Sequence, residues 1–234
     1  MSDVSLTING AQVTGREGMT ILEAARENGI DIPTLCFLED LPPVGACRIC
    51  VVEVEGSRTL VGSCHTPITE GMVIQTHSPK VLESRRILLE LMLASHPDAC
   101  LVCDQANLCE LRKIATDLEV GLPRFNLRKR FYPTEAGNPE IIRDLSKCIL
   151  CRRCVSACRS IKGERMFSIG YRGFESKVVH GFDQPLDKVA CQDCNVCIDV
   201  CPTGALSRPR RVGEPKQGTP LFIKGCVSSV TERK

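Results

Sequence analysis

Sixteen cysteines in a chain of 234 residues are the feature that most restricts how this sequence can fold. Eight of them form two runs with one pattern, C-x2-C-x2-C-x3-C, in "CILCRRCVSAC" (148–158) and "CQDCNVCIDVC" (191–201). In a small secreted chain, so many cysteines would predict disulfides. The N-terminus, "MSDVSLTING", lacks the basic and apolar regions of a secretory signal. We therefore expect a cytoplasmic protein whose thiols stay reduced and bind metal.

The spacing of the repeat is typical of two [4Fe–4S] clusters. In such runs three close cysteines bind one cluster, and the fourth binds the cluster of the other run. The repeat therefore predicts one cluster bound by Cys148, Cys151, Cys154 and Cys201, and a second bound by Cys191, Cys194, Cys197 and Cys158. Pro202 follows the second run as the pattern requires, whereas Arg159 follows the first run and departs from it. Zinc is the alternative, but its sites usually pair two C-x2-C elements across a long gap.

Another group of four cysteines lies closer to the N-terminus: Cys36, Cys47, Cys50 and Cys64. Four thiolates suit a [2Fe–2S] centre, although the first gap is longer than in plant-type ferredoxins. That gap holds a Pro-Pro and a Gly, and such a loop can direct its backbone amides at sulfur. Zinc is again the alternative. His65, beside Cys64, is interpreted as a bystander because four cysteines are already present.

The stretch "SHPDACLVCDQANLC" (95–109) contains three cysteines, one fewer than a four-ligand site needs. Its candidate ligands are Cys100, Cys103 and Cys109, with either His96 or the distant Cys226 as the fourth. Imidazole can replace thiolate at iron, but a lone histidine at a helix end can equally be a surface or capping residue. Spacing favours His96 and leaves Cys226 open.

Local patterns predict an α+β protein. "VSLTI" and "AQVTG" flank Asn9-Gly10, a two-residue hairpin signal. A helix in "MTILEAARENG" ends at Gly29, and "RICVVEVEG", "TLVGSC" and "MVIQT" are typical of short strands, which together indicate a β-grasp sheet. Ser78-Pro79 predicts the start of a second helix, and a shorter helix is expected from Cys109 to about Val120.

These patterns divide the chain into five predicted segments. Residues 1–78 are a β-grasp, ferredoxin-like [2Fe–2S] domain, and 79–121 are a helical segment around the third group of ligands. Residues 122–147 are a connector, 148–208 are a ferredoxin-like domain for two [4Fe–4S] clusters, and 209–234 are an irregular tail.

Charge and missing motifs exclude several classes of function. Thirty basic and 28 acidic residues give a net charge of +2, which argues against nucleic-acid or membrane-surface binding. No run reaches the ~18 apolar residues of a membrane helix. Neither a G-x-G-x-x-G after a strand nor a G-x-x-x-x-G-K-[ST] motif occurs, and no catalytic triad or carboxylate pair stands out. We expect no catalytic site in this chain.

The motifs, in this order, resemble the iron–sulfur region shared by four kinds of protein. These are the large peripheral subunit of complex I, iron-only hydrogenases, the α subunits of NAD-dependent formate dehydrogenases, and the small diaphorase subunit of NAD-linked bidirectional nickel–iron hydrogenases. The resemblance covers about residues 3–208 and includes "IPTLCFLEDLPPVGACRICVVEVEG", "SHPDACLVCDQANLCELRKIA" and "YRGFESKVVHGFDQPL". A chain that ends shortly after the ferredoxin unit is most similar to the diaphorase subunit.

In that family a histidine and three cysteines bind a [4Fe–4S] cluster, so the resemblance implies His96 together with Cys100, Cys103 and Cys109. It implies one [2Fe–2S] and three [4Fe–4S] clusters in the electron-transfer subunit of an NAD(P)-linked oxidoreductase. The implied partners are a flavin- and NAD(P)-binding diaphorase subunit and a catalytic hydrogenase or formate dehydrogenase subunit. A thioredoxin-like [2Fe–2S] subunit often accompanies them, and some relatives bifurcate electrons.

Two other classes of function compete with the subunit hypothesis. The alternative is a stand-alone polyferredoxin, a soluble electron carrier. Such carriers are usually acidic and have a strong steering field, which a net charge of +2 does not provide. The third class is an iron–sulfur sensor or zinc scaffold, and the sequence has no recognisable DNA-binding helix pair for a sensor.

Overall fold

The computed structural model describes residues 2–39, 41–163, 165–186 and 194–209. The chain divides into two compact units, residues 1–94 with 114–127 and residues 95–113 with 128–234. The predicted helical segment 79–121 is thus shared between the two units. The predicted tail beyond residue 209 lies outside the described residues.

A mixed five-stranded sheet forms the first unit. Its strands are β1 (Asp3–Ile8), β2 (Ala11–Arg16), β3 (Val51–Val54), β4 (Val61–Gly62) and β5 (Val73–Gln75), in the spatial order β2-β1-β5-β3-β4. β1 and β5 are parallel, and the other neighbours are antiparallel. Asn9 and Gly10 have φ of 52° and 83°, the left-handed conformation that a tight hairpin turn needs. This is the kind of sheet that the β-grasp interpretation requires.

α1 (Ile21–Glu27) packs against this sheet. A capping box fixes its start, because the Glu23 amide donates to the Thr20 hydroxyl (3.3 Å) and the Thr20 amide donates to the Glu23 carboxylate (2.7 Å). Gly29, with φ of 71°, follows its last turn. The apolar side chains of α1 share one core with those of the sheet, including Leu6, Ile8, Ile21, Leu22 and Ile74.

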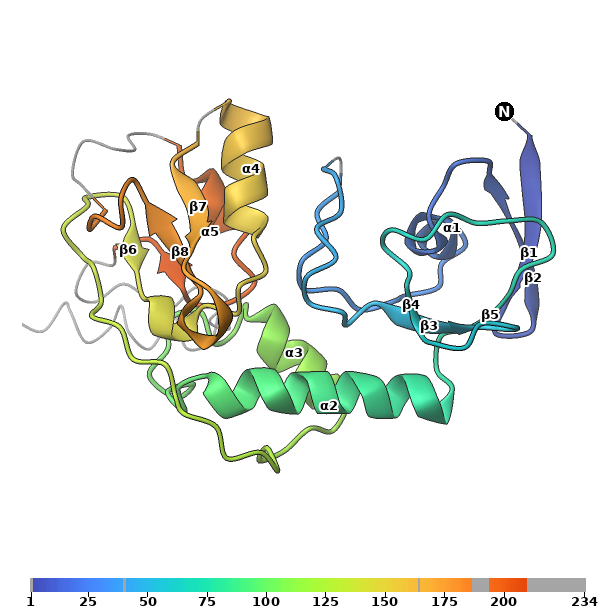
Figure 1. Ribbon diagram of the computed structural model, residues 1–234, viewed down its shortest axis with the longest axis horizontal. Coiled ribbons are helices and arrows are strands. Elements are labelled where there is room, and N and C mark those ends of the chain that lie inside the picture. The colour runs from blue at the N-terminus through green and yellow to red at the C-terminus, as the bar shows by residue number, and fades with distance from the viewer. Residues whose placement is uncertain (1, 40, 164, 187–193, 210–234) are drawn as a thin grey trace, which may run out of the picture. The chain divides into compact units, whose positions relative to one another are not determined.

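α2 (Pro79–Ser95) begins as predicted at Ser78, whose hydroxyl accepts a hydrogen bond from the Val81 amide at 3.3 Å. Figure 1 shows α1 and α2 on opposite sides of strands β3 to β5. α3 (Glu110–Asp117) is shorter than predicted by a few residues. None of the helices in the described ranges combines the length and apolar character needed to cross a membrane.

The second unit contains two small antiparallel sheets. β6 (Ile142–Arg143) pairs with β9 (Leu206–Ser207), and β7 (Phe167–Gly170) pairs with β8 (Lys177–His180). Two short 3₁₀ turns, η1 (Leu145–Lys147) and η2 (Gly173–Glu175), follow β6 and β7 along the chain. α4 (Arg153–Lys162) and α5 (Val196–Asp199) carry cysteines of the two repeated runs, and their side chains meet in one core.

Glu110 attaches the third ligand group to this second unit. Its amide donates to the Pro202 carbonyl at 2.9 Å, and its carboxylate forms an ion pair of 2.6 Å with Arg153. Arg153 is buried and Glu110 is about half exposed. Both contacts join residues directly beside predicted ligands, since Glu110 follows Cys109, Arg153 precedes Cys154, and Pro202 follows Cys201.

Candidate metal centres

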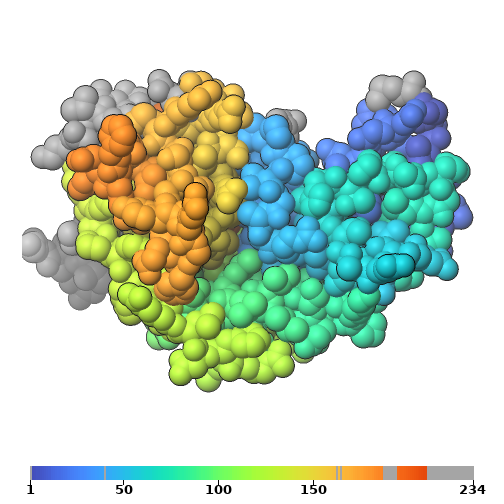
Figure 2. All heavy atoms as spheres, in the orientation of Figure 1, coloured from blue at the N-terminus to red at the C-terminus, as the bar shows by residue number. Residues whose placement is uncertain are grey.

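The first unit gathers Cys36, Cys47, Cys50 and Cys64, and all four are buried, with 1–5% of their surface exposed. The loop that separates the first two, residues 38–39 and 41–46, lies at the surface (Figure 2). It curls so that the Cys47 amide points at the Cys36 sulfur, 3.5 Å away. The longer first gap therefore directs a backbone amide at sulfur, as predicted.

Hydrogen bonds set the acidity of these thiols. A hydrogen bond from the Cys47 side chain lowers the pKa of Cys36 to about 6, and one from Cys64 lowers the pKa of Cys50 to about 6. The pKa values of Cys47 and Cys64 are raised, because these thiols are the donors and are buried. Four interacting sulfurs, two of them readily ionised, fit a site for a multi-iron cluster, which binds thiolate.

His65 lies beside this site. Its Nδ1 is 3.4 Å from the Cys64 sulfur, within hydrogen-bonding distance of a thiol. It thus contacts a candidate ligand without being needed to complete a set of four.

The third group forms a cavity of its own. His96, Cys100, Cys103 and Cys109 all line it, together with Pro97, Ala99, Ala106, Arg112, Lys147 and Gly204. His96 Nδ1 lies 3.1 Å from the Pro97 carbonyl, which fixes a proton on that nitrogen. His96 Nε2 is buried and has no hydrogen-bond partner among the described residues. Metal-binding histidines typically have this arrangement, with one nitrogen on a carbonyl and the other free for metal.

Burial lowers the pKa of His96, and backbone oxygens of Pro97 and Lys147 oppose this effect only in part. A lowered pKa keeps the imidazole neutral, and only the neutral ring can bind a metal. Cys226, the other candidate for this site, lies outside the described residues.

Gly204 forms one wall of this cavity. A Cβ atom at this position would lie 2.7 Å from the Cys103 sulfur, too close for any side chain. Glycine therefore allows the backbone of 201–204 to approach the ligand loop. The same stretch borders the neighbouring cavity, which Cys201, Pro202 and Thr203 line. The two cavities share one short backbone segment.

That neighbouring cavity brings together the predicted set Cys148, Cys151, Cys154 and Cys201. Leu150 and Arg152 have left-handed φ of 57° and 65°, which turns the loop around sulfur. The Leu150 amide lies 3.4 Å from the Cys148 sulfur. Burial raises the pKa of Cys148 to about 11 and that of Cys151 to about 12. These thiols lose water without gaining donors of comparable strength.

The second predicted cluster of the repeat is only partly described. Cys158 and Cys197 are buried in the same core, and Cys194 is half-buried. Cys191 lies outside the described residues. Among those described, no three histidine, cysteine or acidic side chains are arranged to hold a single metal ion.

Besides Arg153, two more buried arginines lie next to candidate ligands, and no sequence motif indicated them. Arg85 on α2 is 1% exposed and contacts the backbone on either side of Cys50. Arg143 on β6 is 2% exposed and lines the cavity of Cys148 and its partners. Helical spacing could have revealed Arg85, since it lies four residues from both Val81 and Leu89 on the buried face of α2.

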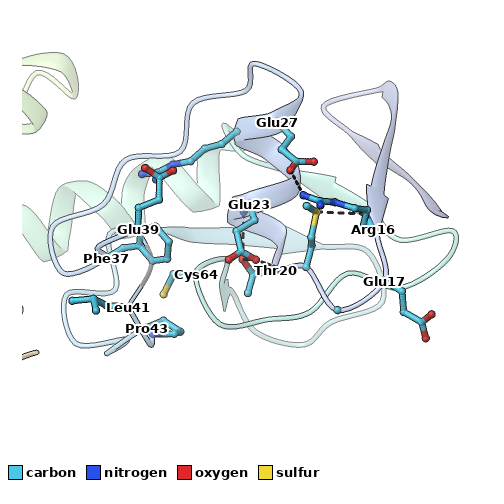
Figure 3. Close-up of a pocket in the computed structure, with 13 residues that line it drawn as sticks. Arg16, Glu17, Thr20, Glu23, Glu27, Phe37, Glu39, Leu41, Pro43 and Cys64 are labelled. Atoms are coloured by element: carbon cyan, nitrogen blue, oxygen red, sulfur yellow. Dashed lines mark hydrogen bonds and ion pairs between the residues drawn. The ribbon is translucent and has the colours of Figure 1, made fainter. Parts of the chain in front are cut away.

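An open hollow of about 640 Å³ lies beside Cys64 in the first unit (Figure 3). Its charged groups are mostly paired with one another. Arg16 contacts Glu27 at 2.7 Å, and Arg26 contacts Glu39 at 3.8 Å, while Glu23 belongs to the capping box of α1. These pairings leave no isolated carboxylate pair of the kind that acid–base catalysis uses.

Three family models match successive parts of the chain. They are a 2Fe-2S iron–sulfur cluster binding domain (residues 2–79), an NADH-ubiquinone oxidoreductase-G iron–sulfur binding region (85–124), and the ferredoxin-like domain of NADH-quinone oxidoreductase subunit 3 (138–207). These matches confirm the two domains expected from the cysteine spacing, an N-terminal [2Fe–2S] domain and a C-terminal ferredoxin-like domain, as members of domain families.

Two curated relatives match most of the chain. The NADP-reducing hydrogenase subunit HndD of Solidesulfovibrio fructosivorans is 43% identical over 88% of this chain and 36% of its own length. An NADH-quinone oxidoreductase subunit of Rhizobium meliloti is 35% identical over 99% of this chain and 28% of its own length. The chain thus spans only about a third of the length of these relatives.

A solved structure of similar length matches as well. One chain of an NAD⁺-reducing [NiFe]-hydrogenase, crystallised in the H2-reduced state, superposes with a TM-score of 0.79 at 28% identity. The match covers 94% of this chain and 92% of that one.

Proposed function

This protein is a homologue of an NADP-reducing hydrogenase subunit and of an NADH-quinone oxidoreductase subunit, and from that kinship we propose that it conducts electrons through four iron–sulfur clusters. One observation carries the proposal. Ligand-type side chains gather into separate sites, and in two of them a backbone amide points at a sulfur.

We assign the ligands as follows. Cys36, Cys47, Cys50 and Cys64 bind a [2Fe–2S] cluster; His96, Cys100, Cys103 and Cys109 bind a [4Fe–4S] cluster; Cys148, Cys151, Cys154 and Cys201 bind a second; and Cys191, Cys194, Cys197 and Cys158 bind a third. Such clusters store one electron at a time. The chain itself holds them apart, buries the sulfurs of the [2Fe–2S] site and donates backbone hydrogen bonds to sulfur. The division into 1–78, 79–121, 122–147, 148–208 and 209–234 is proposed on the same basis.

The proposed partners are a flavin- and NAD(P)-binding subunit on one side and a hydrogenase or formate dehydrogenase subunit on the other, in the cytoplasm. A thioredoxin-like [2Fe–2S] subunit and electron bifurcation are optional features of the same proposed assembly. Exposed apolar residues on a ligand loop support a docked subunit over a free carrier, since Leu101 is 96% and Val102 76% exposed. Size-exclusion chromatography of native extract tests this: co-migration with a flavoprotein supports a subunit, and migration alone supports a polyferredoxin.

Metal analysis of anaerobically purified protein tests the cluster content. We expect about fourteen iron atoms per chain, the sum of one two-iron and three four-iron clusters. Zinc in place of iron would contradict the proposal.

A His96→Ala substitution tests the third site. We expect a loss of about four irons per chain, or a change in the spectrum of one [4Fe–4S] cluster only. His77→Ala is the matched control, because His77 is exposed and bonds only to the adjacent Thr76 in the described contacts. Unchanged iron content and spectra in His96→Ala would exclude His96 as a ligand.

A further inference from the structure

Arg85 occupies an unusual position for a charged residue. It lies in the middle of the buried stripe of α2, between Val81 and Leu89, and only 1% of it is exposed. Removing a guanidinium from water is costly unless other groups compensate its charge and its hydrogen bonds.

The contacts of Arg85 centre on one candidate ligand. Its Nε donates to the Ile49 carbonyl at 2.9 Å, and its Nη2 donates to the Val51 carbonyl at 2.8 Å. These two carbonyls belong to the residues immediately before and after Cys50. The rigid fork of the guanidinium therefore holds the backbone on both sides of this cysteine.

The hydrogen-bond partners of Arg85 are neutral oxygens, so its charge must be balanced in another way. Burial lowers the pKa of Arg85 to about 10, and the negative charges of Cys50 and Asp31 oppose that effect. Even with the lowered pKa, the side chain stays cationic at neutral pH. The two hydrogen bonds of its guanidinium flank Cys50 along the chain, so negative charge bound at that sulfur would lie close to the positive charge of Arg85.

We propose that Arg85 positions Cys50 and raises the reduction potential of the [2Fe–2S] cluster by placing a fixed buried cation beside one of its ligands. This inference rests on the proposed function, since it requires a cluster at Cys36, Cys47, Cys50 and Cys64. Reduction adds one negative charge to the cluster. A nearby cation stabilises that charge more strongly in a poorly solvated interior than in water, and it therefore favours the reduced form.

A redox titration of the full chain, followed by the EPR signal of the [2Fe–2S] cluster, tests the proposal. Arg85→Met removes the charge and keeps much of the apolar stem. We expect the ratio of reduced to oxidised cluster at the wild-type midpoint to fall about tenfold, which is a shift of about 59 mV to more negative potential for a one-electron couple. Arg85→Lys keeps the charge and should shift the ratio much less.

Arg86→Met is the matched control. Arg86 is the next residue on the same helix, and it also donates to a carbonyl, that of Leu118 at 3.1 Å. Arg86→Met also removes one positive charge and one hydrogen bond, but that bond does not involve the residues next to Cys50. The midpoint potential of the [2Fe–2S] cluster should therefore stay at the wild-type value. A shift equal to that of Arg85→Met would mean that only net charge matters, and it would overturn the assignment to Arg85.

Other outcomes also decide the question. An unchanged potential in Arg85→Met with the signal intact overturns the inference and leaves the proposed function standing. Absence of a [2Fe–2S] signal from the wild-type protein overturns the proposed function itself. Should Arg85→Met lose the cluster, Arg85→Gln retains an amide donor without the charge and must show the same negative shift.

The remaining case is loss of the cluster in both neutral variants. A wild-type potential in Arg85→Lys would then support the need for a cation at this position. Loss of the cluster in Arg85→Lys as well would show that Arg85 is a structural clamp and not a tuning residue.

Discussion

Arg85 in the first unit and Arg143 in the second are both buried beside a candidate cluster, but their hydrogen-bond partners differ. Arg85 in the first unit donates to two neutral carbonyls. Arg143 in the second unit donates to the carboxylate of Glu135 through both Nε (3.0 Å) and Nη2 (2.7 Å). The field of Arg143 is therefore cancelled close to its source, whereas that of Arg85 extends to Cys50.

The candidate ligand thiols of the two units also differ in how the protein shifts their pKa values. Hydrogen bonds lower the pKa values of Cys36 and Cys50, whereas burial raises those of Cys148 and Cys151. The first site thus stabilises negative charge on two of its sulfurs before any cluster is bound, while Cys47 and Cys64, the thiols that donate to them, have raised pKa values. In the second site the protein mainly excludes water, so binding iron must itself drive the loss of the protons.

The largest expected effect comes from breaking the ion pair of the second unit. Glu135→Gln leaves Arg143 buried without its countercharge and should reduce the free energy of unfolding by about 3 kcal/mol. Anaerobic thermal unfolding measures the change. Glu175→Gln is the control, since the Arg128–Glu175 pair is exposed and 3.8 Å long, and it should change stability by less than about 0.5 kcal/mol. Equal effects of the two substitutions would contradict the importance of burial.

Gly204→Ala tests whether crowding of the Cys103 sulfur affects only the cluster site of the second unit. The new Cβ would press on the Cys103 sulfur, so we expect a loss of about 2 kcal/mol in stability and an altered spectrum of the cluster proposed at His96. The [2Fe–2S] potential should not change. Gly137→Ala is the control, because a Cβ there meets no atom within 4 Å. A normal spectrum in Gly204→Ala would show that the ligand loop can move aside.

Thr20→Ala removes the capping box of α1 in the first unit and should cost about 1 kcal/mol. The side-chain hydrogen bond it removes joins Thr20 to Glu23 and to no candidate ligand, so the iron content and all potentials should remain at wild-type values. Thr69→Ala, at an exposed position, is the control for the loss of a threonine. A change in the [2Fe–2S] potential would mean that stability and tuning are linked in this unit.

The smallest effect is expected when both Glu135 and Arg143, the buried ion pair of the second unit, are neutralised together. Glu135→Gln combined with Arg143→Met leaves the net charge unchanged, so the potential of the cluster proposed at Cys148 should shift far less than Arg85→Met shifts the [2Fe–2S] cluster. The double variant should also be more stable than Glu135→Gln alone. A shift as large as that of Arg85→Met would remove the distinction between the two arginines.

Local signals in the sequence predicted much of this structure. The Asn9-Gly10 turn, the start of α2 at Ser78 and the gathering of Cys148, Cys151, Cys154 and Cys201 depend on short-range rules of conformation and spacing. The capping box of α1 has a local signature as well, a threonine followed three residues later by a glutamate.

The features that the sequence did not predict depend on contacts between residues far apart in the chain. The third ligand group joins the second unit because Glu110 reaches Arg153 and Pro202, and no local pattern encodes that pairing. Gly204 matters only because Cys103, about a hundred residues earlier, packs against it. Arg85 could be recognised as buried from helical spacing, but its link to Cys50 required the position of α2 beside β3.

The backbone of 201–204 forms a wall of two cavities, with Cys201 in one and Gly204 in the other. An inserted or deleted residue in this tetrapeptide would therefore displace a candidate ligand of one site and open or crowd the other at the same time. The two sites cannot be exchanged separately as modules, either by recombination between relatives or by an engineer grafting one of them onto another scaffold. They form a single transferable block.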